Sequence, residues 1–168
     1  MKGVRPLFEG AYMARKKENA VILSQEMIAQ DIYSMWIKTD AAKDAAPGQF
    51  ISMYTNDGSR LLPRPISICE INKEEGSLRV VYRVTGKNTG TELFSRMKAG
   101  ETIPVIGPLG NGFPYEKASG KKVFLMGGGI GVPPILELAK QMNCGKKQII
   151  MGYRNSETFL KNEFEKYG

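Results

Sequence analysis

The stretch KVFLMGGGIGVPPILELAKQM, residues 122–142, joins a short apolar run to a helical pattern through a glycine-rich turn. Residues 122–126 predict a strand, and the segment from Pro133 and Pro134 onward predicts a helix whose start is fixed by proline. The arrangement repeats, because residues 147–153 predict a second strand and residues 156–167 a second helix. Strands that alternate with helices are typical of a parallel α/β sheet.

The glycine turn matches neither of two common phosphate-binding motifs. A G-x-G-x-x-G fingerprint would need glycine where Val132 stands, and no Lys-Ser or Lys-Thr pair follows to complete a P-loop. Two interpretations remain open at this point. The turn is either a tight corner between strand and helix, or a place where a ligand approaches the backbone closely.

The chain before this stretch predicts a small β barrel. Six runs rich in β-branched and aromatic residues are separated by turn signals such as Pro47-Gly48 and Glu75-Gly76. Six short strands at this spacing are typical of an antiparallel barrel. The predicted strands cover residues 19–28, 31–39, 48–55, 64–71, 77–84 and 101–107.

One helix is predicted between the last two strands, in TGTELFSRMKAG (residues 89–100). Thr89 and Glu92 have capping-box spacing, an apolar stripe follows, and Gly100 is placed to end the helix. We therefore expect a barrel over residues 1–117, with 1–18 as an N-terminal extension. Residues 118–168 are expected to form only the first part of a parallel-sheet domain, because two strands and two helices cannot cover both faces of a sheet.

Composition excludes several classes of function. The chain has 168 residues, 42% of them hydrophobic and 24% charged, which is typical of soluble domains. No apolar run approaches the ~20 residues of a membrane span, and the N-terminus lacks a signal-peptide pattern, so a cytoplasmic protein is expected. The sequence contains no histidine, which excludes Ser-His-Asp and Cys-His nucleophiles and histidine-bound metals within the chain.

The cysteines and charges narrow the choice further. Cys69 and Cys144 belong to no C-x-x-C pair, so neither a disulfide framework nor a cysteine metal site is indicated. The net charge of +7 favours anionic ligands. Nucleic acid is disfavoured because the basic residues are scattered and are not interleaved with aromatic residues.

Three barrel segments carry candidate binding groups. In LLPRPISI (residues 61–68), Arg64 stands between two prolines that hold the backbone extended, and Ser67 follows three positions later. A rigidly presented guanidinium suits phosphate, and Ser67 is expected to donate to a ring nitrogen from the same surface. A solvated arginine on an edge strand is the alternative.

The other two segments are equally open when taken alone. In VVYRV (residues 80–84), a period of two places Tyr82 and Val84 on one face and Arg83 on the other, as in any half-buried strand. Gly90 and Thr91 stand in the first turn of the predicted helix, where free amides favour an anion. Many helix N-termini bind nothing.

Taken together, LLPRPISI, VYRV, GTELFS, GPLGNGFP and GGGIGVPP occur in an order that resembles the flavin-binding domain of the ferredoxin reductase superfamily. More narrowly, they resemble the electron-transfer subunit family of B-type, NAD-dependent dihydroorotate dehydrogenases, over residues 19–168. The resemblance implies an FAD-binding barrel and part of an NAD-binding domain. It also implies transfer of electrons from dihydroorotate oxidation, via FAD, to NAD in pyrimidine biosynthesis.

The resemblance assigns roles to particular residues. Arg64 would contact flavin phosphate, Ser67 the isoalloxazine edge, and the glycine turn the nicotinamide nucleotide. No catalytic residue is assigned, because the cofactor carries the chemistry. A slip of two residues would move the pyrophosphate site from Gly90-Thr91 to Asn88-Thr89. The implied cofactor-binding residues are Arg64, Pro65, Ile66, Ser67, Tyr82, Arg83, Val84, Gly90, Thr91, Gly128, Gly129, Ile130, Gly131 and Val132.

The family pattern also implies partners that this chain alone does not supply. Relatives bind a 2Fe-2S cluster through four cysteines near their C-terminus, whereas this sequence has two cysteines and cannot hold that cluster in the same way. The sequence is therefore expected to be C-terminally truncated, with an incomplete NAD site. The expected partner is an FMN-containing catalytic subunit. Alternatives are another ferredoxin reductase-type FAD/NAD(P)H oxidoreductase subunit, or a non-catalytic barrel module.

Overall fold

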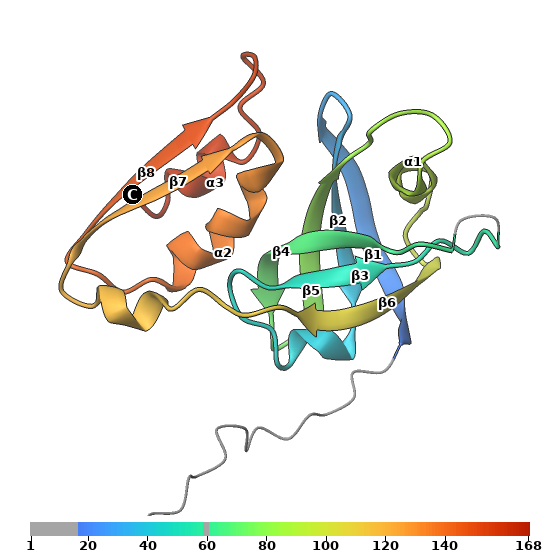
Figure 1. The fold of residues 1–168 in the computed structure, drawn as a ribbon, viewed down its shortest axis with the longest axis horizontal. Helices are drawn as coiled ribbons and strands as arrows, with labels where there is room; N and C mark the ends of the chain where they lie inside the picture. The colour runs from blue at the N-terminus through green and yellow to red at the C-terminus, as the bar shows by residue number, and fades with distance from the viewer. Residues whose placement is uncertain (1–16, 59–60) are drawn as a thin grey trace, which may run out of the picture.

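The computed structural model describes residues 17–58 and 61–168, which form two units lying side by side (Figure 1). The first unit is a closed barrel whose strands pair in the order β1-β2-β5-β4-β3-β6, with every pair antiparallel. The six-stranded antiparallel barrel predicted from the sequence is thereby confirmed. Its strands are β1 (Glu18–Ala29), β2 (Ile32–Lys38), β3 (Phe50–Met53), β4 (Arg64–Asn72), β5 (Ser77–Arg83) and β6 (Thr102–Leu109).

Alternating side chains fill the barrel. Successive residues of a strand point to opposite faces, so every second residue of these strands points into the interior, and most of these residues are apolar. A short 3-10 helix, η1 (Asp40–Ala42), contributes the small buried side chains of Ala41 and Ala42. The other interior residues include Ile22, Met35, Ile37, Ile51, Met53, Ile68, Leu78, Val80, Tyr82, Ile103 and Val105.

Helix α1 (Gly90–Ser95) begins at the predicted cap. The Thr89 side chain accepts a hydrogen bond from the Glu92 amide at 3.2 Å, but the Glu92 carboxylate accepts from the Asn88 amide. Only half of the predicted capping box therefore forms. The prediction that Gly100 ends this helix is wrong: α1 stops at Ser95, and Gly100, with φ of +89°, belongs to the turn that leads into β6.

The C-terminal end of α1 is held by a side chain of the barrel. Gln25 of β1 donates through Nε2 to the carbonyl oxygens of Phe94 at 3.0 Å and Met97 at 2.7 Å. Phe94 belongs to the last turn of α1, where its carbonyl also accepts from the Met97 amide at 3.0 Å, and Met97 follows the helix. The helix is therefore fixed to the barrel wall at the end opposite to Gly90.

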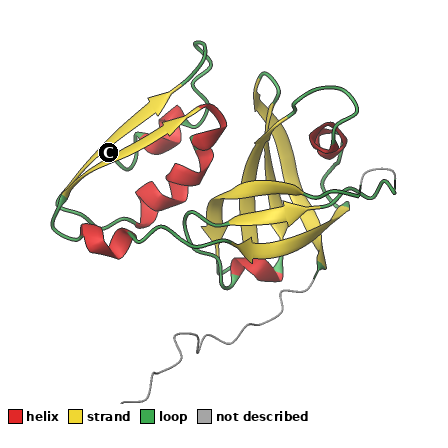
Figure 2. Ribbon diagram, viewed as in Figure 1, coloured by secondary structure: helices red, strands yellow, loops and turns green. Residues whose placement is uncertain are grey.

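The second unit contains the predicted strand–turn–helix arrangement. Strands β7 (Lys122–Gly128) and β8 (Lys146–Gly152) pair in parallel, and α2 (Pro133–Gln141) connects them. Two 3-10 turns flank β7, η2 (Tyr115–Ala118) and η3 (Gly129–Gly131). The domain boundary predicted at residue 117 falls inside η2 and stays a prediction. Figure 2 shows the helices of this unit between its sheet and the barrel.

The last helix is much shorter than predicted. Residues 156–167 were expected to be helical, but only α3 (Lys161–Phe164) forms. Leu160 has a φ of +64°, which is incompatible with a continuous right-handed helix. Phe159, Leu160 and Phe164 are all buried, so tertiary packing of these apolar side chains overrides the local helical pattern.

One apolar cluster continues from the barrel into the second unit. Ile32, Cys69 and Val81 stand on the outer face of the barrel and belong to the same buried cluster as Leu136 and Ala139 of α2. Burial raises the pKa of the Cys69 thiol. In the described part of the chain, no helix is long and apolar enough to cross a membrane.

A buried arginine adds a polar contact between the units. Arg79 of β5 pairs through Nη1 with Glu70 of β4 at 2.8 Å and with Glu163 of α3 at 2.6 Å. Its Nε donates to Ser34 Oγ at 2.9 Å. Burial alone would lower the pKa of Arg79, but the hydrogen bonds to the two carboxylates raise it, so the guanidinium stays charged.

Gly48 provides a test of the barrel. Its φ of +91° is unfavourable for a residue with a side chain, and a Cβ atom there would lie 2.6 Å from Phe113 Cδ2. We expect Gly48→Ala to lower the free energy of unfolding by about 1–3 kcal/mol, measured by urea unfolding of Trp36 fluorescence. Gly131→Ala, where a Cβ meets nothing within 4 Å, is the control and should change stability by less than about 0.5 kcal/mol. Equal effects of the two substitutions would contradict the prediction.

Candidate cofactor-binding site

Arg64 lies at the start of β4, directly against the first residue of α1. Its Nη1 donates to the Leu62 carbonyl at 2.9 Å, and a Cβ atom built on Gly90 would lie only 3.1 Å from Arg64 Nε. Within residues 17–58 and 61–168, no carboxylate lies within ion-pair distance of Arg64. A guanidinium without a counter-ion beside a glycine is suited to a phosphate group.

The start of α1 is the second part of this candidate anion site. Gly90 and Thr91 are the first two residues of the helix, so their amides precede the intrahelical hydrogen bonds. The Thr91 hydroxyl is buried, 3.1 Å from Thr89 Oγ1, and accepts a hydrogen bond from the Thr85 amide at 3.4 Å. An anion at this site would therefore meet backbone amides rather than the Thr91 hydroxyl.

Arg64 and Ser67 do not share one surface, contrary to the sequence-based expectation. They are three positions apart, so their side chains leave β4 on opposite faces. Ile66 packs against the barrel core on the Arg64 side, while Pro65 and Ser67 are exposed on the other side. The two residues are therefore placed to contact different parts of a ligand.

The end of β5 presents its predicted residues on two faces. Tyr82 is buried in the barrel core, and Arg83 lines a cleft outside it. Val84, the residue after β5, packs against the core and also lines the cleft. Tyr82 is 1% exposed, its hydroxyl donates to Gln25 Oε1 at 2.7 Å, and its ring stacks on Tyr33. Burial raises the pKa of Tyr82, so its hydroxyl remains protonated.

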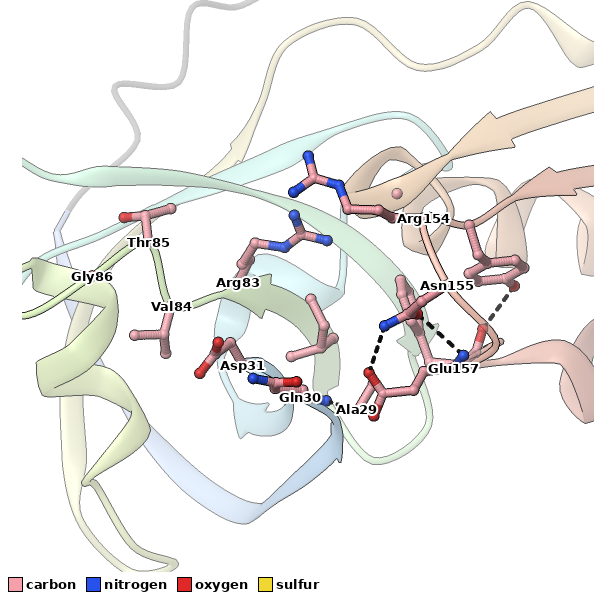
Figure 3. A pocket seen from close by; sticks show the side chains of 14 residues that line it. Ala29, Gln30, Asp31, Arg83, Val84, Thr85, Gly86, Arg154, Asn155 and Glu157 are labelled. Atoms are coloured by element: carbon pink, nitrogen blue, oxygen red, sulfur yellow. Dashed lines mark hydrogen bonds between the residues drawn. The ribbon is translucent and has the colours of Figure 1, made fainter.

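The cleft lies between the two units and has a volume of about 550 Å³. One wall comes from the turn between β1 and β2 and from the end of β5, and the other from Gly129 and the segment after β8. Figure 3 shows the side chains of Arg83 and Arg154 extending into it from these two walls. Like Arg64, neither arginine has a carboxylate within ion-pair distance in the described residues.

The glycine turn reaches this cleft at one residue. Gly129, with φ of +53°, lines the cleft, whereas Gly128, Ile130 and Gly131 are outside the lining and Val132 is completely buried. The Val132 side chain therefore packs in the core and does not face a ligand. Pro133 opens α2, as the sequence predicted.

Arg154 is a candidate residue that the sequence analysis missed. It follows the carboxyl end of β8, and Gly152 of β8 pairs with Gly128 of β7. Ligands of open parallel sheets bind at the carboxyl ends of the strands. The signal that could have identified Arg154 is therefore its position after the second predicted strand, opposite the glycine turn.

Comparison with known proteins identifies the barrel. Residues 19–114, which include every strand of the barrel apart from the first residue of β1, match the oxidoreductase FAD-binding domain family. The chain belongs to this family. The candidate anion site at Arg64 and Gly90 lies inside the matched region, and a guanidinium without a described ion-pair partner beside a glycine fits a phosphate group of FAD.

Two curated relatives extend the similarity beyond the barrel. The chain is 42% identical over 151 residues to the electron transfer subunit of dihydroorotate dehydrogenase B (NAD(+)) from Streptococcus mutans, covering 88% of this chain and 57% of the relative. It is 41% identical over 161 residues to the subunit of the same description from Enterococcus faecalis, covering 93% and 60%. The chain thus spans about 60% of the length of these relatives.

Solved structures share the fold across both units. A NADH-dependent reduced ferredoxin-NADP oxidoreductase structure is 30% identical with a TM-score of 0.71, covering 83% of this chain and 50% of that chain. A ferredoxin NADP+ reductase from Neisseria gonorrhoeae with bound FAD and NADP has a TM-score of 0.74 at 19% identity, covering 88% and 62%. The ferredoxin reductase fold predicted from the sequence is confirmed.

Arg64 should dominate the affinity for FAD. We expect Arg64→Lys to weaken FAD binding about tenfold or more, because an ammonium cannot make the bidentate contact of a guanidinium. The dissociation constant is measured by quenching of flavin fluorescence. Arg96→Lys is the matched control, since Arg96 is an exposed residue just beyond α1 that pairs with Glu92. Unchanged FAD affinity in the Arg64 variant would contradict the role.

Tyr82 should affect stability rather than ligand affinity. We expect Tyr82→Phe to lower the free energy of unfolding by about 1–2 kcal/mol, because it removes the hydrogen bond to the half-buried Gln25 amide. Since the ring does not reach the surface, the dissociation constant for FAD should change by less than about twofold, which is a difference in binding free energy smaller than RT. A large loss of affinity with unchanged stability would show that Tyr82 contacts the ligand directly.

Proposed function

We propose that this chain works in the electron-transfer subunit of an NAD-dependent dihydroorotate dehydrogenase, between dihydroorotate oxidation and NAD in pyrimidine biosynthesis. The observation that carries the proposal is identity of about 40% to such subunits over about nine-tenths of the chain, across both units. Five solved structures of the same fold have sequence identities of 14–21% over a comparable share, and the NADH-dependent reduced ferredoxin-NADP oxidoreductase structure has 30%. The similarity to the electron transfer subunits is therefore much closer than a shared fold requires.

The barrel would bind and orient FAD, which supplies hydride and single-electron chemistry when bound. The Arg64 guanidinium would form an ion pair with the pyrophosphate, and the amides of Gly90 and Thr91 would donate hydrogen bonds to it. Ser67, exposed on the outer face of β4, would donate a hydrogen bond to the edge of the flavin ring. Tyr82 supports this arrangement from inside the barrel, and Pro65, Ile66, Arg83 and Val84 complete the two strand segments proposed to contact FAD.

The cleft between the units would receive the nicotinamide nucleotide. Arg83 and Arg154 line the cleft without a described carboxylate within ion-pair distance, although Asp31 and Glu157 line it too, and the two guanidinium groups would bind a diphosphate. Gly129 allows close approach of the ligand to the backbone at the carboxyl end of β7. Gly128, Ile130, Gly131 and Val132 would act by shaping this turn.

The chain's own residues do not fit a 2Fe-2S cluster. The sequence has two cysteines, Cys69 lies in the core between the units, and burial raises its thiol pKa, which opposes the thiolate that iron requires. We assign no step through a cluster to these residues. Oxidation of dihydroorotate would take place on a separate, FMN-containing catalytic subunit.

A second candidate is another ferredoxin reductase-type oxidoreductase subunit. The observation in its favour is the 30% identity to the NADH-dependent reduced ferredoxin-NADP oxidoreductase structure. The two candidates differ in their electron partner. Mixed with a dihydroorotate dehydrogenase catalytic subunit, the FAD-loaded chain should elute with it in size-exclusion chromatography under the first proposal, and should elute separately under the second.

Arg154 tests the nucleotide side of the proposal. We expect Arg154→Ala to raise the NADH concentration needed for half-maximal bleaching of bound flavin about tenfold, because a charged hydrogen bond to phosphate is lost. FAD content should remain that of the unsubstituted chain. Lys146→Ala, at the opposite end of β8, is the matched control. If both substitutions weaken NADH equally, the effect is one of net charge and the assigned contact is wrong.

A further inference from the structure

Glu137 is a buried acidic residue whose main contact lies in the other unit. Its side chain belongs to α2 and is almost completely inaccessible, at 1% exposure. Glu137 Oε2 accepts a hydrogen bond from the Ile71 amide of β4 at 2.8 Å. Oε1 accepts from Gln141 Nε2 at 2.7 Å, and Gln141 Oε1 accepts in turn from the Tyr115 hydroxyl at 2.9 Å. Charged side chains are rarely buried without such partners.

The barrel leaves a donor free at this place. β3 pairs with β4 only between Arg64 and Ser67, and Ile68 then donates to the carbonyl of Gln49. Beyond that point, no strand of the described residues neighbours this edge of β4, so the Ile71 amide requires another acceptor. Glu137 supplies it from α2. The helix thus takes the place of a missing strand for one hydrogen bond.

This contact joins the two elements that carry the proposed ligand sites. α2 starts immediately after the glycine turn, and β4 starts at Arg64 and carries Ser67. The other polar contacts between the units lie nearer the surface. Lys140 Nζ of α2 lies 3.9 Å from Glu70 Oε1 of β4. Glu163 of α3 bonds to Arg79, and the exposed Glu157 accepts from the Gln30 amide at 3.2 Å. Glu137 acts on α2 itself, and Lys140 Nζ lies 3.9 Å from its Oε2.

We propose that Glu137 is a positioning residue that fixes the glycine turn relative to the flavin-binding strand β4. It touches neither proposed ligand, and it acts through α2 and Ile71 to set the separation between the flavin and nicotinamide sites. The functional role of that separation rests on the proposed function. The hydrogen bond between Glu137 and Ile71 does not depend on it, so the positioning role of Glu137 and the proposed function can fail independently.

The test compares two substitutions of similar size. Glu137→Leu removes the acceptor and leaves the buried Ile71 amide without a partner. Glu137→Gln keeps an acceptor, and its new NH₂ group can donate to Gln141 Oε1 if the Gln141 amide rotates, with the Tyr115 hydroxyl then accepting from Gln141. Glu165→Leu is the matched control, because Glu165 is an exposed glutamate in the same unit that pairs with Lys161.

Two readouts that do not depend on bound cofactor follow the position of α2. Spin labels at Ser24→Cys on β1 and Gln148→Cys on β8, in a Cys144→Ser background, report the distance between the units. Hydrogen exchange reports protection along the chain. We expect Glu137→Leu to broaden the distance distribution and to speed exchange in α2 and the glycine turn about tenfold to a hundredfold. Barrel amides should remain protected, and Glu137→Gln and Glu165→Leu should match the unsubstituted chain.

Three results would overturn the proposal. One is a distance distribution in the Glu137→Leu chain as narrow as that of the unsubstituted chain. Another is loss of protection throughout the barrel, which would make Glu137 a general stability residue. The third is a Glu137→Gln chain that behaves like Glu137→Leu. A parallel FAD titration separates the two ideas: an unsubstituted chain that binds no FAD contradicts the proposed function, while the label distances still decide the role of Glu137.

Discussion

The double burial of β5 is the constraint on which the rest of the structure depends. Leu78, Val80 and Tyr82 fill the barrel, while Arg79 and Val81 on the opposite face pack beneath the second unit. A strand covered on both faces cannot shift its register without exposing apolar side chains on one of them. Its end is therefore fixed, and that end carries Arg83 into the cleft and leads into the loop before α1.

The two candidate ligand sites are connected through this loop. Thr85 lines the cleft, and its amide donates a hydrogen bond to the hydroxyl of Thr91 in the first turn of α1, where the pyrophosphate is proposed to bind. The arginines differ in their ion pairs according to where they lie. Buried Arg79 has two carboxylate partners, whereas Arg64, Arg83 and Arg154 have none in ion-pair range among the described residues. Unpaired guanidinium groups thus gather where phosphates are proposed to bind.

Much of the fold could be predicted because local signals and tertiary packing agree. The six barrel strands, the Thr89 cap and the strand–turn–helix at the glycine run all have short-range patterns that survive in the structure. The helix over residues 156–167 could not be predicted, because Leu160 adopts a left-handed conformation to bury its neighbours. Arg154 and Glu137 have no local motif. Their importance arises from pairing of β7 with β8 and from the open edge of β4, which only the assembled chain defines.

Gln25 has a consequence for the thermodynamics of ligand binding. By binding the carbonyls of Phe94 and Met97 and the Tyr82 hydroxyl, it orders the end of α1 without a ligand. The loss of conformational entropy at the turn proposed to bind phosphate would therefore accompany folding of the barrel and not association of the cofactor. The affinity of the proposed site would then reflect contacts and desolvation, with little contribution from ordering of the chain.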